Sequence, residues 1–190
     1  MSHLPLDAEL LYAELKRGVQ ALGAGSATPL HLVGVATGGA WLAERLQREL
    51  GLPGPAGIIS STLHRDDYAQ RGLRAHGSQT RLPFEVNGAQ VLLIDDVIHT
   101  GRTLRAVINE LYDHGRPACV RLAVLVDRGG RELPLAPDFA AVRLPLDAAL
   151  RFELVRRPEG GFDFELAAET ASKTAATGPT PGSKAQEGAA

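Results

Sequence analysis

Apolar residues recur at helical spacing near the start of the chain. Between residues 7 and 22 they form one stripe with the period of an α-helix, which contains Leu10, Leu11, Leu15, Val19 and Leu22. Asp7 stands where an N-cap is expected, because its short carboxylate can accept from the first free N–H groups of a helix. The pattern predicts a helix over 7–22 whose apolar stripe faces the core.

Short, nearly uninterrupted apolar runs follow, at residues 30–36, 56–63, 90–96 and 118–126. Their length and aliphatic content are typical of buried strands. The run at 90–96 holds four consecutive large aliphatic residues, which indicates a parallel strand covered on both faces. We therefore expect these runs to pair in a parallel sheet.

Glycine-containing turns join two of these strands to helices. Thr37-Gly38-Gly39 leads from the first strand into a helical pattern at 40–50, which Gly51 closes. His99-Thr100-Gly101 leads from the third strand into a helical pattern at 102–115. Strand, turn and helix in this order predict an α/β fold, a parallel sheet with right-handed crossovers and flanking helices.

The rest of the chain has a different character. Residues 151–156 and 161–166 alternate about a turn at Pro158–Gly161, which predicts an antiparallel hairpin. The segment 65–81 is polar and glycine-containing and predicts a flexible surface loop. Residues 169–190 lack large apolar side chains, so we expect one domain over 1–168 and a disordered low-complexity tail over 169–190.

Composition indicates which partners and which cellular compartment to expect. The chain has 190 residues, 44% of them hydrophobic, and a formal net charge of -2, so no global basic field indicates a nucleic-acid partner. Its one cysteine, Cys119, excludes a disulfide framework and suits a reducing compartment. The first ten residues lack a signal-peptide pattern, and no apolar stretch reaches membrane-spanning length. We expect a soluble cytoplasmic protein.

Polar clusters follow three of the predicted strands. They are Thr37-Gly38-Gly39, the segment from Asp95-Asp96 to Thr103, and Asp127 to Arg131. In an open parallel sheet, ligands bind beyond the carboxyl ends of the strands. The three clusters should therefore converge on one site.

The segment 91–103, VLLIDDVIHTGRT, combines an anion cradle with paired acids. A helix N-terminus offers free N–H groups, and the loop His99-Thr100-Gly101-Arg102-Thr103 is small enough for a phosphate to approach them. Asp95 and Asp96 can accept from a vicinal diol and hold Mg²⁺, directly or through water. This predicts a ribose 5-phosphate site. The alternative is that both acids are structural caps; a P-loop nucleotide site lacks its glycine-rich lysine motif here.

The same segment resembles the PRPP-binding motif of type I phosphoribosyltransferases. With GVATGG (34–39), TLHRDD (62–67), YDHGRPA (112–118) and LVDRGGRELP (125–134), it is similar to the family of pyrimidine-operon attenuators and uracil phosphoribosyltransferases. The resemblance covers about residues 7–155. It implies a type I phosphoribosyltransferase-like sheet flanked by helices, with a small hood region and a flexible loop.

The resemblance also implies roles for individual residues. Thr37, Gly38 and Gly39 would form the pyrophosphate loop, and Arg65 would close over the pyrophosphate as a catalytic residue. Asp95 and Asp96 would be catalytic, hold the ribose diol and bind the Mg²⁺ cofactor. The 5-phosphate would lie against His99, Thr100, Gly101, Arg102 and Thr103, and the base pocket would include Asp127, Arg128 and Gly129.

The chain departs from the family pattern at two positions. Many relatives carry Arg where this chain has Gly38. The glycine removes one cation from the site of the leaving pyrophosphate. Many also carry His where this chain has Gly130, in the turn of the base pocket. At His99, purine-using members of the superfamily place an Asp near N7 of the base. Histidine there argues against purines, although we expect a solvated loop histidine rather than a catalytic one.

The resemblance implies a uracil phosphoribosyltransferase that makes UMP and pyrophosphate from uracil and PRPP with Mg²⁺, as part of a homo-oligomer. The alternative is an RNA-binding attenuation regulator that senses UMP or PRPP, with minor or lost transferase activity. Only scattered arginines support an RNA leader as a partner, and no aromatic-basic RNA module is present. The sequence thus favours the enzyme, with regulation as a further role.

Overall fold

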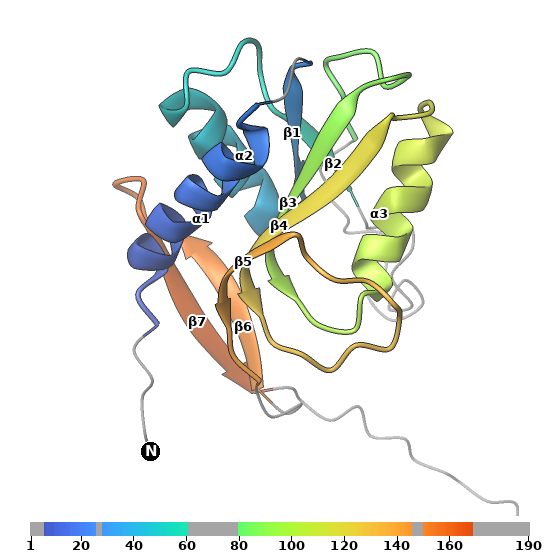
Figure 1. Ribbon diagram of the computed structural model, residues 1–190. Coiled ribbons are helices and arrows are strands. Elements are labelled where there is room, and N and C mark those ends of the chain that lie inside the picture. The colour runs from blue at the N-terminus through green and yellow to red at the C-terminus, as the bar shows by residue number, and fades with distance from the viewer. Residues whose placement is uncertain (1–5, 26–27, 61–79, 146–149, 169–190) are drawn as a thin grey trace, which may run out of the picture.

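The computed structural model describes residues 6–25, 28–60, 80–145 and 150–168 (Figure 1). Its elements follow in the order α1 (Ala8–Gly23), β1 (Leu30–Val35), α2 (Gly38–Glu49), β2 (Gly57–Ile59), β3 (Gln90–Ile98), α3 (Arg102–Asp113), β4 (Cys119–Asp127), β5 (Phe139–Arg143), β6 (Leu150–Arg156) and β7 (Phe162–Ala168). No helix among these described residues is long and apolar enough to cross a membrane.

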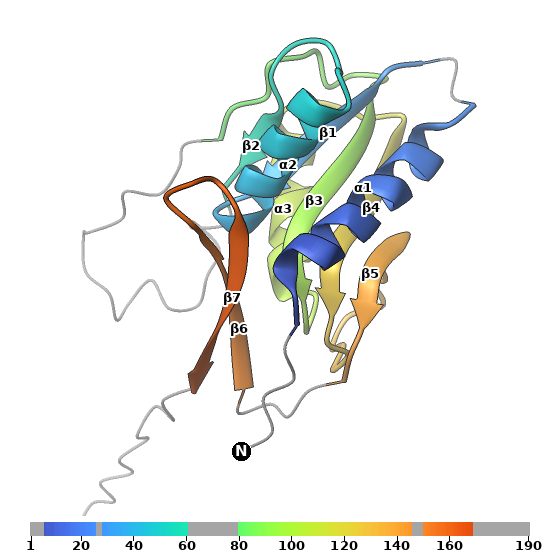
Figure 2. The same ribbon diagram turned by 90° about the vertical axis from the view of Figure 1, so that its left-hand side faces the viewer.

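A five-stranded sheet in the order β2-β1-β3-β4-β5 forms the centre of the molecule. Every pairing in it is parallel. Helices α1 and α2 cover one face and α3 covers the other (Figures 1 and 2). The predicted α/β fold with a parallel sheet is confirmed.

The core lies on both faces of the central strand β3. Leu92 and Ile94 pack on the side of α1 and α2, whereas Val91 and Leu93 pack on the side of α3. All four are fully buried. Alternate side chains of a strand point to opposite faces, so a strand between two helical layers must be apolar at every position. This is the physical origin of the aliphatic run in the sequence.

Helix α1 begins as predicted, but its buried stripe differs from the predicted one. The Asp7 carboxylate accepts from Glu9 N at 2.9 Å and from Leu10 N at 3.1 Å. Leu15 and Val19 are buried, whereas Leu10 is 67% exposed, so its prediction as a core residue was wrong. Ala8 and Tyr12 lie on the buried stripe instead, because they precede Leu15 by seven and three residues on the same helical face.

Several boundaries also differ from the sequence prediction. Helix α2 starts at Gly38, inside the predicted turn, and β3 continues past Asp96 to Ile98. Strand β5 was missed; it pairs with β4 from Phe139 opposite Ala123 and is only half-buried at the sheet edge. Its sequence, FAAVR, is short and includes two alanines, which leaves a weaker pattern than the large aliphatic residues of β3.

The predicted C-terminal hairpin is confirmed as β6 paired antiparallel with β7. It forms its own two-stranded sheet next to α1 and α2 (Figure 2). Leu154 and Phe162 are buried and join the core cluster that includes Leu15 of α1. We call this hairpin, residues 150–168, the hood. The predicted loop 65–81 and tail 169–190 lie, apart from Thr80 and Arg81, outside the described residues.

Candidate functional site

A cavity of about 640 Å³ opens at the carboxyl ends of the sheet strands. Its wall comes from the β1–α2 turn, the end of β3 with the loop into α3, the turn after β4, and the hood. The predicted site residues that line it are Thr37, Gly38, Asp95, Asp96, His99, Thr100, Gly101, Thr103 and Arg128. The structure thus brings together residues that are spread over about 90 positions of the sequence, as the topology of a parallel sheet predicts.

Other predicted site residues lie outside the cavity wall. The Arg102 side chain pairs with Glu132 at 2.7 Å and is 66% exposed. Gly39, Asp127 and Gly129 are absent from the lining. Arg65 lies outside the described residues, so its predicted role stays a prediction.

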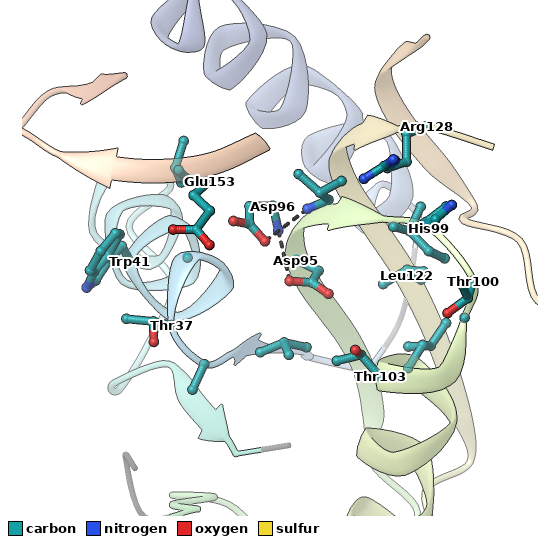
Figure 3. Close-up of a pocket in the computed structure, with 18 of the residues that line it drawn as sticks. Thr37, Trp41, Asp95, Asp96, His99, Thr100, Thr103, Leu122, Arg128 and Glu153 are labelled. Carbon is teal, nitrogen blue, oxygen red and sulfur yellow. Dashed lines mark hydrogen bonds between the residues drawn. The ribbon is translucent and has the colours of Figure 1, made fainter. Parts of the chain in front are cut away.

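The two acids lie in the middle of the cavity, between Thr37 and Trp41 at one end and His99 and Arg128 at the other (Figure 3). Asp95 accepts from the N–H of Asp96 at 3.0 Å, and Asp96 accepts from the N–H of Val97 at 2.9 Å. Each bond engages one oxygen, Oδ1, of its carboxylate. The carboxylates are therefore held in place by their own backbone while they line the cavity.

The loop into α3 has the form expected of an anion cradle. Gly101 is the N-cap residue with φ 90°, and as a glycine it has no side chain that could cap the helix. This left-handed conformation strains any residue with a Cβ. The Thr100 hydroxyl accepts from Arg102 N at 3.3 Å, and the Thr100 carbonyl accepts from Glu132 N at 3.0 Å. The N–H of Arg102 is thus engaged by Thr100, and a phosphate beside Thr100 and Thr103 would approach the N–H groups that follow it in the first turn of α3.

The two glycines of the β1–α2 turn have different surroundings. A Cβ at Gly39 would lie 2.2 Å from the Ile94 carbonyl oxygen, so Gly39 allows α2 to approach β3 closely. A Cβ at Gly38 would lie 2.5 Å from Oδ2 of Asp96. Gly38 is therefore in direct contact with the acid pair, and the peptide bond before Thr37 is cis. Of the predicted pyrophosphate loop, Thr37 and Gly38 face the cavity and Gly39 serves packing.

The turn after β4 is tied to the α3 loop by Arg131, the last residue of the predicted polar cluster Asp127 to Arg131, to which no individual role was assigned. Its guanidinium donates to the His99 carbonyl and, at 2.9 Å, to the Leu135 carbonyl. It also pairs with Asp127 at 2.6 Å. The Asp127 carboxylate is thus engaged within its own turn, which explains why it does not line the cavity. The only sequence signal for this ion pair was the presence of an acid and an arginine four residues apart.

Comparisons with known proteins place the chain in a family. The phosphoribosyl transferase domain family matches residues 11–148. A curated protein of Ralstonia nicotianae, "Bifunctional protein PyrR", is 51% identical over 161 residues, which are 84% of this chain and 91% of that protein. The protein of the same name from Pseudomonas aeruginosa strain LESB58 is 47% identical over 123 residues, covering 65% of this chain and 72% of that protein.

The chain belongs to the PyrR family of phosphoribosyltransferases. Solved structures support the fold. A hypoxanthine-guanine phosphoribosyltransferase of Bacillus anthracis superposes with a TM-score of 0.57 at 18% identity, covering 76% of this chain and 83% of that one. The hypoxanthine phosphoribosyltransferase of Trypanosoma cruzi gives 0.55 at 18% identity, covering 78% and 85%.

A further part of the cavity wall was not predicted from the sequence. Trp41 of α2 and Glu153, Leu154 and Val155 of β6 line the cavity. Glu153 and Trp41 lie at the end of the cavity that holds Thr37 (Figure 3). The hairpin pattern predicted β6 but carried no signal that it would lie over the site.

The hood of this phosphoribosyltransferase is anchored by a polar junction with α1 and α2. The Glu9 carboxylate accepts from Phe162 N at 2.7 Å and from Arg45 at 2.8 Å. The Arg45 guanidinium lies 4.0 Å from the centre of the Tyr12 ring. The hydrogen bond from Arg45 holds the pKa of Glu9 below its usual value, and burial raises the pKa of Tyr12. Since Phe162 pairs with Arg156, next to Val155, this junction positions the hood wall.

Phosphoribosyltransferases use Mg²⁺ with PRPP, and the residues present fit that ion. Among the described residues, no group of three or more His, Cys, Asp or Glu side chains could hold a metal by itself. Mg²⁺ is usually bound through one or two carboxylates together with water and substrate phosphates. Asp95 and Asp96 supply such carboxylates beside the predicted diphosphate end of the cavity.

Proposed function

We propose that the chain transfers the 5-phosphoribosyl group of PRPP to N1 of uracil, which gives UMP and pyrophosphate. The observation that carries the proposal is that Asp95 and Asp96 share one cavity with the N-terminal loop of α3. A diol-binding acid pair next to a phosphate cradle fits ribose 5-phosphate. The location at the carboxyl edge of a phosphoribosyltransferase sheet supports the same assignment.

The cavity orders the parts of PRPP along its length. The 5-phosphate would accept from the Thr100 and Thr103 hydroxyls and the first N–H groups of α3. The ribose hydroxyls would donate to Asp95 and Asp96. The diphosphate would then extend towards Thr37 and Gly38, where the absence of a Cβ at Gly38 lets the Asp96 carboxylate lie against the turn.

In the proposed reaction the bond from ribose C1 to the diphosphate oxygen breaks and the bond from C1 to uracil N1 forms. The N1 proton is released, and the electron pair of the broken bond leaves with pyrophosphate. Positive charge develops on the ribose ring, and the nearby carboxylates stabilise it. Positioning of the two reactants supplies much of the remaining rate enhancement. Bound Mg²⁺ would neutralise charge on the departing diphosphate.

The experiment follows both binding and turnover. The chain has one tryptophan, Trp41, which lines the cavity, so its fluorescence reports ligand binding without turnover. PRPP with Mg²⁺ should change that fluorescence saturably, and UMP should form only when PRPP, uracil and Mg²⁺ are all present. Saturable PRPP binding without UMP formation from uracil would refute the proposed transfer.

A second candidate is regulation of pyrimidine genes through binding of an RNA leader. It is supported by the word "bifunctional" in the names of the curated relatives. If the chain has this role, filter binding should show a leader RNA that binds more tightly with UMP present. Affinity should fall steeply between roughly 50 and 200 mM salt, because contacts to phosphates release counterions. Equal affinity with and without UMP would exclude UMP-dependent regulation.

A further inference from the structure

His99 packs directly on the backbone of Gly130. A Cβ built on Gly130 would lie 2.6 Å from Nε2 and 2.8 Å from Cδ2 of the imidazole. Such distances are below van der Waals contact, so a side chain at position 130 would have to displace the ring. The adjacent Gly129 has the same backbone conformation, φ 71° against 69°, but a Cβ there would meet nothing within 4 Å. The missing side chain at 130 is thus space that the imidazole occupies.

The main chain of His99 is fixed as well. Its carbonyl accepts from the Arg131 guanidinium, which also pairs with Asp127 at 2.6 Å. His99 is half-buried and lines the cavity at the end that holds Thr100 and Arg128 (Figure 3). His99 is thus only partly exposed, and the side that is exposed faces the cavity.

The position of His99 relates it to the incoming base. At ribose C1, the diphosphate leaves from one face and the base enters from the other. Thr37, at the proposed diphosphate end, lies across the acid pair from His99 (Figure 3). The side chain of His99 is therefore at the end of the cavity where the base must enter.

We infer that the His99 side chain binds the pyrimidine ring of the base by a hydrogen bond. We also infer that the absence of a side chain at Gly130 determines the position of the His99 imidazole. This inference rests on the proposed function. A neutral imidazole has one N–H donor and one acceptor, and its donor suits an exocyclic carbonyl oxygen of uracil. A carboxylate at position 99 accepts only and would repel that oxygen. His99 is thus a specificity-determining residue whose position depends on the absence of a side chain at Gly130.

The test measures the ratio of UMP affinity to ribose 5-phosphate affinity by Trp41 fluorescence. Both ligands use the phosphate cradle and the acid pair, so the ratio isolates the contribution of the base. His99→Ala should lower the ratio about tenfold, as expected for one lost hydrogen bond in a partly buried site. His99→Asn keeps an N–H donor and should retain more of the ratio than His99→Ala. His99→Asp should lose at least as much as His99→Ala.

Gly130→Ala and Gly129→Ala form a matched pair for the second half of the inference. Both place an alanine at a left-handed φ and carry the same backbone strain. Only Gly130→Ala meets the His99 ring, so it should lower the affinity ratio several-fold more than Gly129→Ala. In the His99→Ala background, Gly130→Ala should lower the ratio no further than Gly129→Ala does.

The outcomes separate the two proposals. If UMP binds much more tightly than ribose 5-phosphate and His99→Ala leaves that ratio unchanged, the role of His99 is refuted while the proposed function stands. Equal loss in Gly129→Ala and Gly130→Ala would refute the placement by Gly130. If the unaltered chain makes no UMP and binds UMP no better than ribose 5-phosphate, both the proposed function and this inference fail.

Discussion

The carboxylate of Glu9 accepts a hydrogen bond of 2.7 Å from the main-chain N–H of Phe162, 153 positions later in the chain. Glu9 lies in the first turn of α1, and Phe162 is the first residue of β7. The same carboxylate pairs with Arg45 of α2. One side chain therefore joins the first helix, the second helix and the hood, which carries Glu153, Leu154 and Val155 into the cavity wall.

Glu9→Ala should loosen the hood. It leaves the Phe162 N–H and the Arg45 guanidinium without this acceptor, a loss of about 1–3 kcal/mol, which corresponds to several degrees in Tm for a chain of this size. Amide hydrogen exchange should accelerate in β6 and β7 more than in β3. Glu9→Gln retains an acceptor for Phe162 and should lose less. Equal acceleration throughout the sheet would show that the junction has no local role.

Stability should fall in acid because of the same junction. The hydrogen bond from Arg45 lowers the pKa of Glu9. Arg45 also pairs with Glu49 of α2. Burial raises the pKa of Glu49, but hydrogen bonds from Arg45 and Lys16 outweigh that effect and lower it to about 2. A depressed folded-state pKa means that the stabilisation is complete above the unfolded value of 4.5 and is lost as the pH falls towards 2.

Urea unfolding midpoints measured between about pH 7 and pH 2.5 check this dependence. Arg45→Met removes the partner shared by both acids, so it should lower stability at neutral pH and flatten the decline below 4.5. A variant that declined with acid as steeply as the unaltered chain would show that other carboxylates determine the acid response.

Asp96→Asn should reduce kcat while sparing the fold. The variant loses a charge beside the developing positive ribose, which costs on the order of 3 kcal/mol or at least a hundredfold in rate. Asparagine Oδ1 can still accept from the Val97 N–H, a bond of 2.9 Å, so Tm should change little. Asp163→Asn is the control, since its carboxylate is 56% exposed on the hood outside the cavity lining. A normal kcat with a lowered Tm would instead identify Asp96 as a structural cap.

Thr100→Val should raise KM for PRPP about tenfold, because it replaces a hydroxyl donor of the phosphate cradle by a methyl group of similar size. The effect on KM for uracil should be smaller. Thr28→Val makes the same replacement just before β1, at the amino end of the strands and away from the cavity. Steady-state kinetics with PRPP and uracil varied separately give the two KM values for each variant, and Thr28→Val should change neither. An unchanged KM for PRPP in Thr100→Val would show that the Thr100 hydroxyl does not bind the 5-phosphate.

Much of the central architecture was predictable because burial on both faces imposes an uninterrupted aliphatic pattern. Val91 to Ile94 identified β3 in this way, and Asp7 located the start of α1. Leu10 was assigned to the wrong face because five apolar residues in one helix fit more than one stripe. Strand β5 was missed because its five residues, FAAVR, include two alanines and form too short an apolar run to indicate a strand.

The site was predictable where it follows strand ends, and not where distant segments meet. Asp95, Thr100 and Thr103 follow directly from the strand-turn-helix pattern. Other features depend on tertiary packing between separate elements. They are the position of Glu153 in the hood, the bond from Arg131 to the His99 carbonyl, and the contact of His99 with Gly130. Nothing in their local sequence states which neighbour they will meet.

The central claim is uracil phosphoribosyl transfer, and the most direct test is kcat/KM for a panel of bases with PRPP and Mg²⁺. Uracil, hypoxanthine, guanine and orotate are compared on the purified chain, with product nucleotides resolved by chromatography. The account predicts UMP formation from uracil, dependent on Mg²⁺, with no measurable product from the other three bases. Faster turnover of a purine than of uracil, or the absence of any UMP, would contradict it.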